Sequence, residues 1–130
     1  MSIRIVRLGS PRSANEGLRI GTARRPPRGV PKEKFAALDY YDVWFPNLAP
    51  SAELLRFGLS KPLEGAHYNA FAKRYRAEMN TPDRARELEV LAALSKQTNF
   101  AVGCYCEQES QCHRSVLRTL FVERGASVTA

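Results

Sequence analysis

The chain has 130 residues, of which 44% are hydrophobic and 25% are charged, and its formal net charge is +7. This length and balance predict one folded domain over residues 1–130 and exclude an extensively disordered protein. No apolar run approaches the roughly 20 residues that cross a membrane. The first residues also lack the apolar stretch of a secretory signal, so we expect neither feature.

The positive charge is concentrated near the start of the chain. Residues 1–34 carry nine Lys or Arg and two Glu, whereas residues 35–130 carry eleven basic and eleven acidic residues. A basic segment attracts phosphates or other anions, from nucleic acids or from small metabolites, but it is also typical of a solvated loop. No aromatic residue is interleaved with these arginines, as single-strand stacking platforms require, so a dedicated nucleic-acid surface is not favoured.

Three short strands are predicted in the first half of the chain. Residues 3–8 are β-branched and free of breakers, residues 18–23 are weakened by a glycine, and residues 40–45 are rich in aromatic side chains. Residues 9–17 have the composition of a loop. Three prolines exclude residues 24–31 from a helix interior or a central strand, so we expect an extended basic loop there.

Helices are predicted mainly in the second half. Ser51 can cap a short helix over residues 52–57. Thr81 and Pro82 are typical of a helix start. The helix between these two has an apolar face whose members recur at steps of three and four, namely Tyr68, Phe71, Ala72, Tyr75 and Met79.

A buried strand and a last helix complete the predicted elements. Residues 99–104 contain a compact apolar run, which is typical of a strand covered on both faces. The last helix is expected to start at Cys112 or His113 and to stop near Gly125. This order predicts an α/β layered domain with a mostly parallel sheet of three to five strands and helices on both faces.

Residues 104–114 hold all three cysteines and one of the two histidines. A thiol in the first turn of a helix experiences the positive end of the helix dipole, which lowers its pKa. Cys112 is therefore the predicted thiolate, His113 can transfer a proton, and Arg114 adds positive charge beside them. Ser110 is the preferred cap of the helix. The spacing does not match the Cys-x5-Arg loop of phosphatases and sulfurtransferases.

Three functional interpretations of this segment and one structural interpretation stay open. The first is a catalytic anion-binding pocket built on Cys112, His113 and Arg114. The second is a zinc site with Cys104, Cys106, Cys112 and His113 as ligands. The spacing argues against zinc, because a Cys-x-Cys pair in a strand directs its thiols to opposite faces.

The third interpretation is a redox pair of Cys106 and Cys112 across the loop. The structural alternative makes Cys104 a core residue and leaves the remaining residues to start a helix, with Arg114 paired to Glu107 or Glu109. An odd number of crowded cysteines does not resemble a secreted disulfide framework, so we expect a cytoplasmic protein with free thiols.

Several short motifs together resemble the YeaO-like branch of DUF488, a bacterial family of unknown function. The first three are Pro11-Arg12-Ser13, Pro27-Arg28-Gly29-Val30 and Leu48-Ala49-Pro50-Ser51. They are followed by Phe71-x3-Tyr75-Arg76-x-Glu78, and the Cys104–Arg114 segment is similar to the cysteine signature of the wider family. Ala23 and Pro26 stand where that branch has an acidic residue and a Trp, so roles of those two residues are not carried over.

The resemblance implies a Rossmann-like domain in which Arg12, Arg28 and the Cys112–Arg114 segment converge on one cleft. It implies no established reaction. We therefore predict binding of a small anionic or phosphorylated ligand at the junction of the 99–104 strand and the last helix. In this prediction the chain is a cysteine-dependent enzyme, and the anionic ligand is its substrate. The expected anion-binding residues are Arg12, Arg28, Arg114 and Ser110.

Cys112 is the expected nucleophile or redox thiol of this enzyme and His113 its acid or base. Cys104, Cys106 and Tyr105 are expected to line the pocket or to take part in redox chemistry. No cofactor is predicted, and zinc is the alternative. The competing hypothesis is a non-catalytic module that binds nucleic acid or a nucleotide through residues 1–34.

Overall fold

Four strands form one parallel sheet in the order β1-β4-β2-β3. The computed structural model describes residues 1–129. The strands are β1 (Ile3–Arg7), β2 (Leu18–Gly21), β3 (Val43–Trp44) and β4 (Phe100–Cys104). β4 is an interior strand between β1 and β2, since Val102 is in register with Ile5 of β1 and with Ile20 of β2. The predicted parallel α/β architecture is confirmed.

Residues 1–129 also contain four α-helices. Three of them, α1 (Ala52–Leu59), α2 (Gly65–Met79) and α3 (Pro82–Leu94), connect β3 to β4, and α4 (His113–Glu123) follows β4. The Ser51 side chain caps α1 by accepting a hydrogen bond from the backbone N–H of Leu54. Short 3-10 turns are η1 (Lys32–Lys34), η2 (Pro46–Leu48) and η3 (Glu109–Gln111).

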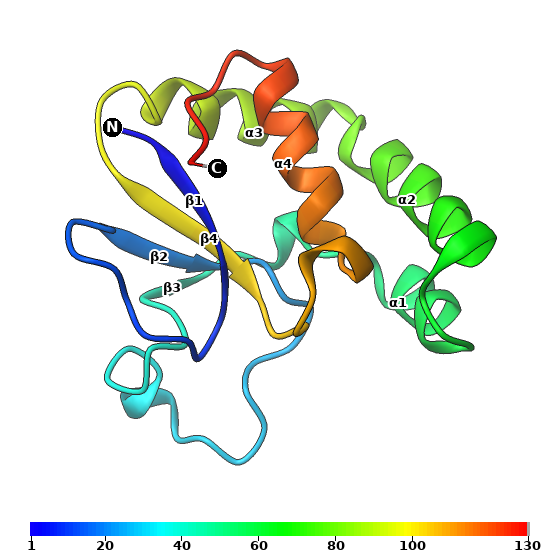
Figure 1. Cartoon of the computed structure of the whole chain (residues 1–130), viewed down its shortest axis with the longest axis horizontal. Helices are drawn as coiled ribbons and strands as arrows, with labels where there is room; N and C mark the ends of the chain where they lie inside the picture. The colour runs from blue at the N-terminus through cyan, green and yellow to red at the C-terminus, as the bar shows by residue number, and fades with distance from the viewer. Residues whose placement is uncertain (130) are drawn as a thin grey trace.

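The main hydrophobic core lies between the sheet and the α-helices, all four of which cover the same face of the sheet (Figure 1). Phe100 and Val102 of β4 point to this side. Their helical partners include Leu54 of α1, Phe71 and Tyr75 of α2, Leu88 and Leu91 of α3, and Leu117, Leu120 and Phe121 of α4. The apolar periodicity predicted for the helices is therefore their buried face.

A loop, rather than a helix, covers the opposite face. Val6 and Ala101 point to this side and pack with Tyr41, Phe35 and Tyr40. The expectation of α-helices on both faces is corrected in this respect, since only the short turn η1 lies in the covering segment (Figure 1). The three prolines between residues 26 and 31 explain the difference, because they remove helix donors from the β2–β3 connection.

The strands are shorter than the sequence pattern predicts. β2 ends at Gly21, and β3 contains only two residues, Val43 and Trp44. A Cβ atom at Gly21 would lie 2.4 Å from the Tyr41 ring, so glycine leaves the space that this ring occupies against β2. Within the described part of the chain, no helix has the length and apolarity to cross a membrane.

Candidate functional site

Three cysteine thiols meet at the carboxyl end of β4. Cys104 is the last residue of β4, Cys106 lies in the following turn, and Cys112 immediately precedes α4. Their Sγ atoms all lie within 4.8 Å of one another, and the Cys104 and Cys106 sulfurs are 4.0 Å apart. The expectation that these two thiols face opposite ways is wrong, because β4 ends at Cys104 and strand alternation does not continue into the turn.

The three thiols differ in exposure. All are free, and Cys104 and Cys112 are buried whereas Cys106 is exposed. Ala23 and Tyr105 pack around the buried pair. Solvent therefore reaches Cys106 directly, while Cys112, with 1% of its surface exposed, is shielded.

His113 connects Cys112 to the end of β2. Its Nδ1 lies 3.6 Å from the Cys112 Sγ, and its Nε2 lies 3.2 Å from the Thr22 Oγ1. The Thr22 hydroxyl donates its own proton to the Gly103 carbonyl at 2.9 Å. The hydroxyl oxygen must then accept from Nε2–H, which leaves Nδ1 free to take the thiol proton of Cys112.

The surroundings of Cys112 favour its ionised form. Hydrogen bonds from the Cys104 and Cys106 thiols, and the neighbouring His113, lower the pKa of Cys112 against the opposing effect of burial. The hydrogen bonds with Cys106 and Cys112 raise the pKa of Cys104. For Cys106, the bond with Cys104 lowers the pKa, but the bond with Cys112 and burial outweigh it and raise the value to about 11. These opposite shifts favour Cys112, rather than Cys104 or Cys106, as the thiol of the cluster that ionises first.

Arg114 is a buried cation beside these sulfurs. Only 3% of it is exposed, and its Nη2 donates to the Cys106 carbonyl at 2.6 Å. Its Nε has no hydrogen-bond partner within residues 1–129. The alternative that pairs Arg114 with Glu107 or Glu109 is wrong, because Glu109 binds Arg118 and the exposed Glu107 lies near Arg7. Within residues 1–129, Arg114 is therefore a buried guanidinium that has a carbonyl, and no carboxylate, as its partner.

Arg12 and Ser110, two of the four expected anion-binding residues, do not lie where the anion-binding prediction requires them. The Arg12 guanidinium is engaged by Asp39 and Asp42, at 3.2 and 2.9 Å, and is not free to hold a ligand. Ser110 lies exposed in η3. The residue at the N-cap of α4 is Cys112, whose side chain makes no capping hydrogen bond.

Arg28, the third of these residues, lines a hollow of about 590 Å³ next to the cysteine turn. The other lining residues are Arg25, Pro26, Pro27, Tyr40 and Tyr105. Tyr105 lies between Cys104 and Cys106 in the chain and donates a hydrogen bond to the Arg25 carbonyl at 2.9 Å. Folding thus places the Tyr105 ring beside the basic loop, although the two are far apart in the sequence.

Thr22, Arg25 and Tyr40 are site residues that sequence reasoning missed. Thr22 directly follows β2, whose carboxyl end lies at the same edge of the sheet as that of β4. That shared edge was a usable signal, because ligands of open parallel sheets bind there. No comparable signal existed for Tyr40, which reaches the hollow from a loop on the opposite face.

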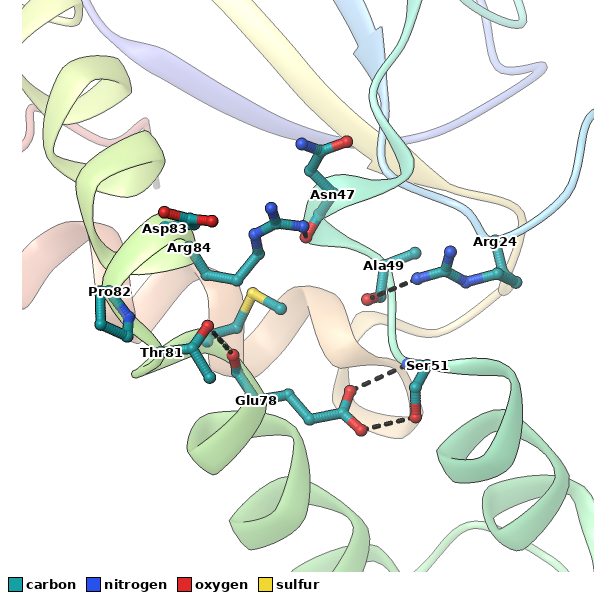
Figure 2. A pocket seen from close by; sticks show the side chains of 10 residues that line it. Arg24, Asn47, Ala49, Ser51, Glu78, Thr81, Pro82, Asp83 and Arg84 are labelled. Atoms are coloured by element: carbon teal, nitrogen blue, oxygen red, sulfur yellow. Dashed lines mark hydrogen bonds between the residues drawn. The ribbon is translucent and has the colours of Figure 1, made fainter.

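A second hollow, of about 480 Å³, lies between the start of α1, the end of α2 and the start of α3 (Figure 2). The Glu78 carboxylate accepts hydrogen bonds from the Ser51 backbone N–H, at 2.9 Å, and from its hydroxyl. Arg24 donates to the carbonyls of Pro46, Ala49 and Pro50. The Glu78 and Arg24 side chains in this hollow are thus engaged by groups of the same chain, and the bond between Glu78 and Ser51 links α2 to the start of α1.

Comparison with known proteins supports the resemblance seen in the sequence. A family model described as "Active DUF488-N3 subclade" matches residues 3–125. The chain belongs to the DUF488 family. The match spans every strand and helix of this DUF488 protein, including the cysteine cluster and the basic loop. No curated protein and no solved structure matches it.

Proposed function

We propose that this DUF488 protein is a cysteine-dependent enzyme acting on a small anionic ligand, with Cys112 as the nucleophile. The arrangement of Cys112, His113 and Thr22 carries the proposal, since Nδ1 lies 3.6 Å from the sulfur and Nε2 is held by Thr22. A nucleophile within reach of a base that a third group orients is the general form of an activated nucleophile. The word "active" in the description of the matching family model agrees with a catalytic role.

The proposed step follows from these positions. His113 Nδ1 holds the proton taken from the Cys112 thiol. Sγ attacks an electrophilic carbon or phosphorus of the ligand, the bond to the leaving group breaks, and the leaving group takes the proton from Nδ1. Water, with His113 again as the base, then releases the product and restores Cys112. Because Cys112 is 1% exposed, the turn that carries Cys106 must move before a ligand reaches it.

Thiolate absorbance in the ultraviolet, measured against pH, tests the proposal. We expect one thiolate per chain at neutral pH in the native protein and none in Cys112→Ser, whereas Cys106→Ser should retain it. The expected cause is the lowered pKa of Cys112 in its hydrogen-bonded position. If the native protein acquires its first thiolate only near pH ~8.5, the ordinary value for cysteine, the activated-nucleophile proposal fails.

Zinc binding is a second candidate, favoured by the grouping of the three sulfurs within 4.8 Å. Zinc binds thiolates at about 2.3 Å, so small movements of Cys104, Cys106 and Cys112 would close them around one ion. Such an ion would occupy the sulfur that the first proposal needs. Near-stoichiometric zinc in purified protein, lost in both Cys106→Ser and Cys104→Ser, would support this candidate, and metal-free protein that does not bind added zinc would exclude it.

Nucleic-acid binding through residues 1–34 is the weaker proposal. Arg12, Arg19 and Arg24 of this segment are engaged by groups of the same chain, which leaves fewer guanidinium groups for a phosphate backbone. We also propose a cytoplasmic location, because three free thiols this close together stay reduced only in a reducing compartment.

A further inference from the structure

The hollow beside the cysteine turn combines two guanidinium groups with two aromatic rings. Arg25 and Arg28 are exposed, and no acidic residue is among the six that line the hollow. The rings of Tyr40 and Tyr105 have their centres 6.2 Å apart and meet at 71°, so they form a corner rather than a stack. The volume of the hollow, about 590 Å³, lies within the range typical of small-ligand sites.

The basic loop that forms this hollow is held in place at three points. Tyr105 donates its hydroxyl proton to the Arg25 carbonyl, at 2.9 Å, and Trp44 donates Nε1–H to the Ala23 carbonyl at the same distance. Arg24 points away and donates to the carbonyls of Ala49 and Pro50. These contacts fix the start of the loop and hence the Arg25 side of the hollow before a ligand arrives, which reduces the entropy lost on binding.

A smaller hollow of about 340 Å³ lies on the other side of the same two tyrosines. Its remaining lining residues are Arg7, Leu8, Gly9 and Ser10. The Tyr105 hydroxyl proton is already donated to the Arg25 carbonyl, so this side chain offers a ligand the surface of its ring. The tyrosines thus separate two adjoining recesses, both with a basic side chain and neither with an acidic one.

We infer that the Tyr40–Tyr105 corner, together with Arg25 and Arg28, binds a nucleotide, with the base on the tyrosine rings and the phosphate on the guanidinium groups. Aromatic rings and arginines in one hollow supply the two kinds of contact that a base and a phosphate need. This inference rests on the proposed function, because it names the class of the anionic substrate and places its binding groups in the hollow beside the cysteine turn. Tyr105 links the two, since it also packs against Cys104 and Cys112.

Calorimetry with adenosine monophosphate, adenosine and ribose 5-phosphate tests the inference. We expect the mononucleotide to bind about tenfold more tightly than either fragment, because each fragment keeps only the stacking or only the charged contacts. Arg28→Ala and Arg25→Ala should each weaken mononucleotide binding by about tenfold. Arg56→Ala, which removes an exposed arginine on α1, is the matched control and should have no effect.

Equal binding of ribose 5-phosphate and the mononucleotide would overturn the inference, and so would an equal loss with Arg56→Ala. A thymidine oligomer that binds far more tightly than the mononucleotide, with a steep salt dependence, would assign the hollow to nucleic acid instead. The same titration with Cys112→Ser separates the two proposals, because Cys112 does not line the hollow. Mononucleotide binding without an activated thiol would overturn the enzyme proposal alone.

Discussion

Cys112 is held in its position by main-chain as well as side-chain contacts. Its extended backbone, with φ of −138° and ψ of 159°, directs the chain from η3 into α4. The Tyr68 hydroxyl donates to the Cys112 carbonyl at 2.9 Å, so α2 anchors the start of α4. The His113 ring packs edge-on against Tyr75, with ring centres 5.2 Å apart. The Cys112–His113 pair is thus preorganised, as an active nucleophile requires.

Thr22→Val tests this arrangement, because valine keeps the shape of threonine and removes its hydroxyl. His113 Nε2 then loses its partner, which we expect to cost about 1–3 kcal/mol of stability, whereas the Gly103 carbonyl keeps its hydrogen bond from the residue-22 backbone N–H. We also expect the pKa of Cys112 to rise, since Nδ1 is no longer oriented. Urea unfolding and thiolate absorbance measure the two effects. Thr119→Val, an exposed threonine on α4, is the control, and an unchanged thiolate fraction in Thr22→Val would contradict the assigned role.

At the scale of elements, a buried ion pair joins β2 to the two loops beside it. Arg19 is fully buried, and its Nε and Nη2 donate to the Glu16 carboxylate at 2.8 and 2.9 Å. Its Nη1 donates to the carbonyls of Ser10 and Asp39. One side chain therefore fixes the loop after β1 and the loop before β3, and with them the face that carries Tyr40 and Tyr41.

Glu16→Gln is expected to destabilise the protein by about 3–5 kcal/mol at neutral pH, because it leaves the Arg19 guanidinium buried without a counter-ion. Burial raises the pKa of Glu16, but the hydrogen bonds from Arg19 and Ser13 outweigh this and lower it. The stability it contributes is therefore present above the ordinary value of about 4.3 and is lost as the pH falls through the lowered value.

Acid unfolding curves should consequently be flatter for Glu16→Gln than for the native protein. Urea midpoints between pH 3 and 7 measure this difference. Glu89→Gln, which removes an exposed carboxylate from α3, should leave the curve unchanged. Parallel curves for Glu16→Gln and the native protein would show that the ion pair does not stabilise the fold.

At the scale of the whole molecule, the site forms where separate parts of the chain meet at one edge of the sheet. β4 supplies Cys104, the segment after β2 supplies Thr22 and the basic loop, and α4 supplies His113 and Arg114. With all four helices on one face, the other face depends on a loop for its cover. Aromatic side chains of that loop, Tyr40 among them, therefore reach the same edge.

The cysteine cluster should make the free energy of unfolding of the whole domain decrease as the pH becomes alkaline. The pKa of Cys106 is raised to about 11, and that of Cys104 is also raised, so the folded protein keeps protons that the unfolded chain releases above about pH 8.5. This stability is present below pH ~8.5 and is lost as the pH rises toward the folded values. We expect the fall between pH 8 and 10 to be smaller in Cys106→Ser, measured by urea unfolding.

Gln108→Ala, an exposed change in the same turn, is the control for this measurement and should follow the native curve. The native protein should keep its thiols reduced throughout. An identical alkaline slope in Cys106→Ser and the native protein would show that the raised pKa of Cys106 does not contribute to stability.

The sequence by itself determined the parallel α/β class, the apolar faces of the helices, the family, and the crowding of chemically useful residues between 104 and 114. These depend on local patterns, namely periodicity, capping and short motifs, which act over a few residues. The helix boundary at His113 and the left-handed Gly125 after α4 agree with such patterns.

Only the tertiary structure decided which residues form the site. Whether the Cys104 and Cys106 thiols face together depends on where β4 ends, and that is set by its pairing with β1 and β2. Arg12 forms ion pairs with Asp39 and Asp42. Arg25 and Arg28 instead line a hollow together with Tyr40 and Tyr105. These contacts join residues distant in the sequence, and the packing that brings them together leaves no periodic trace in the chain.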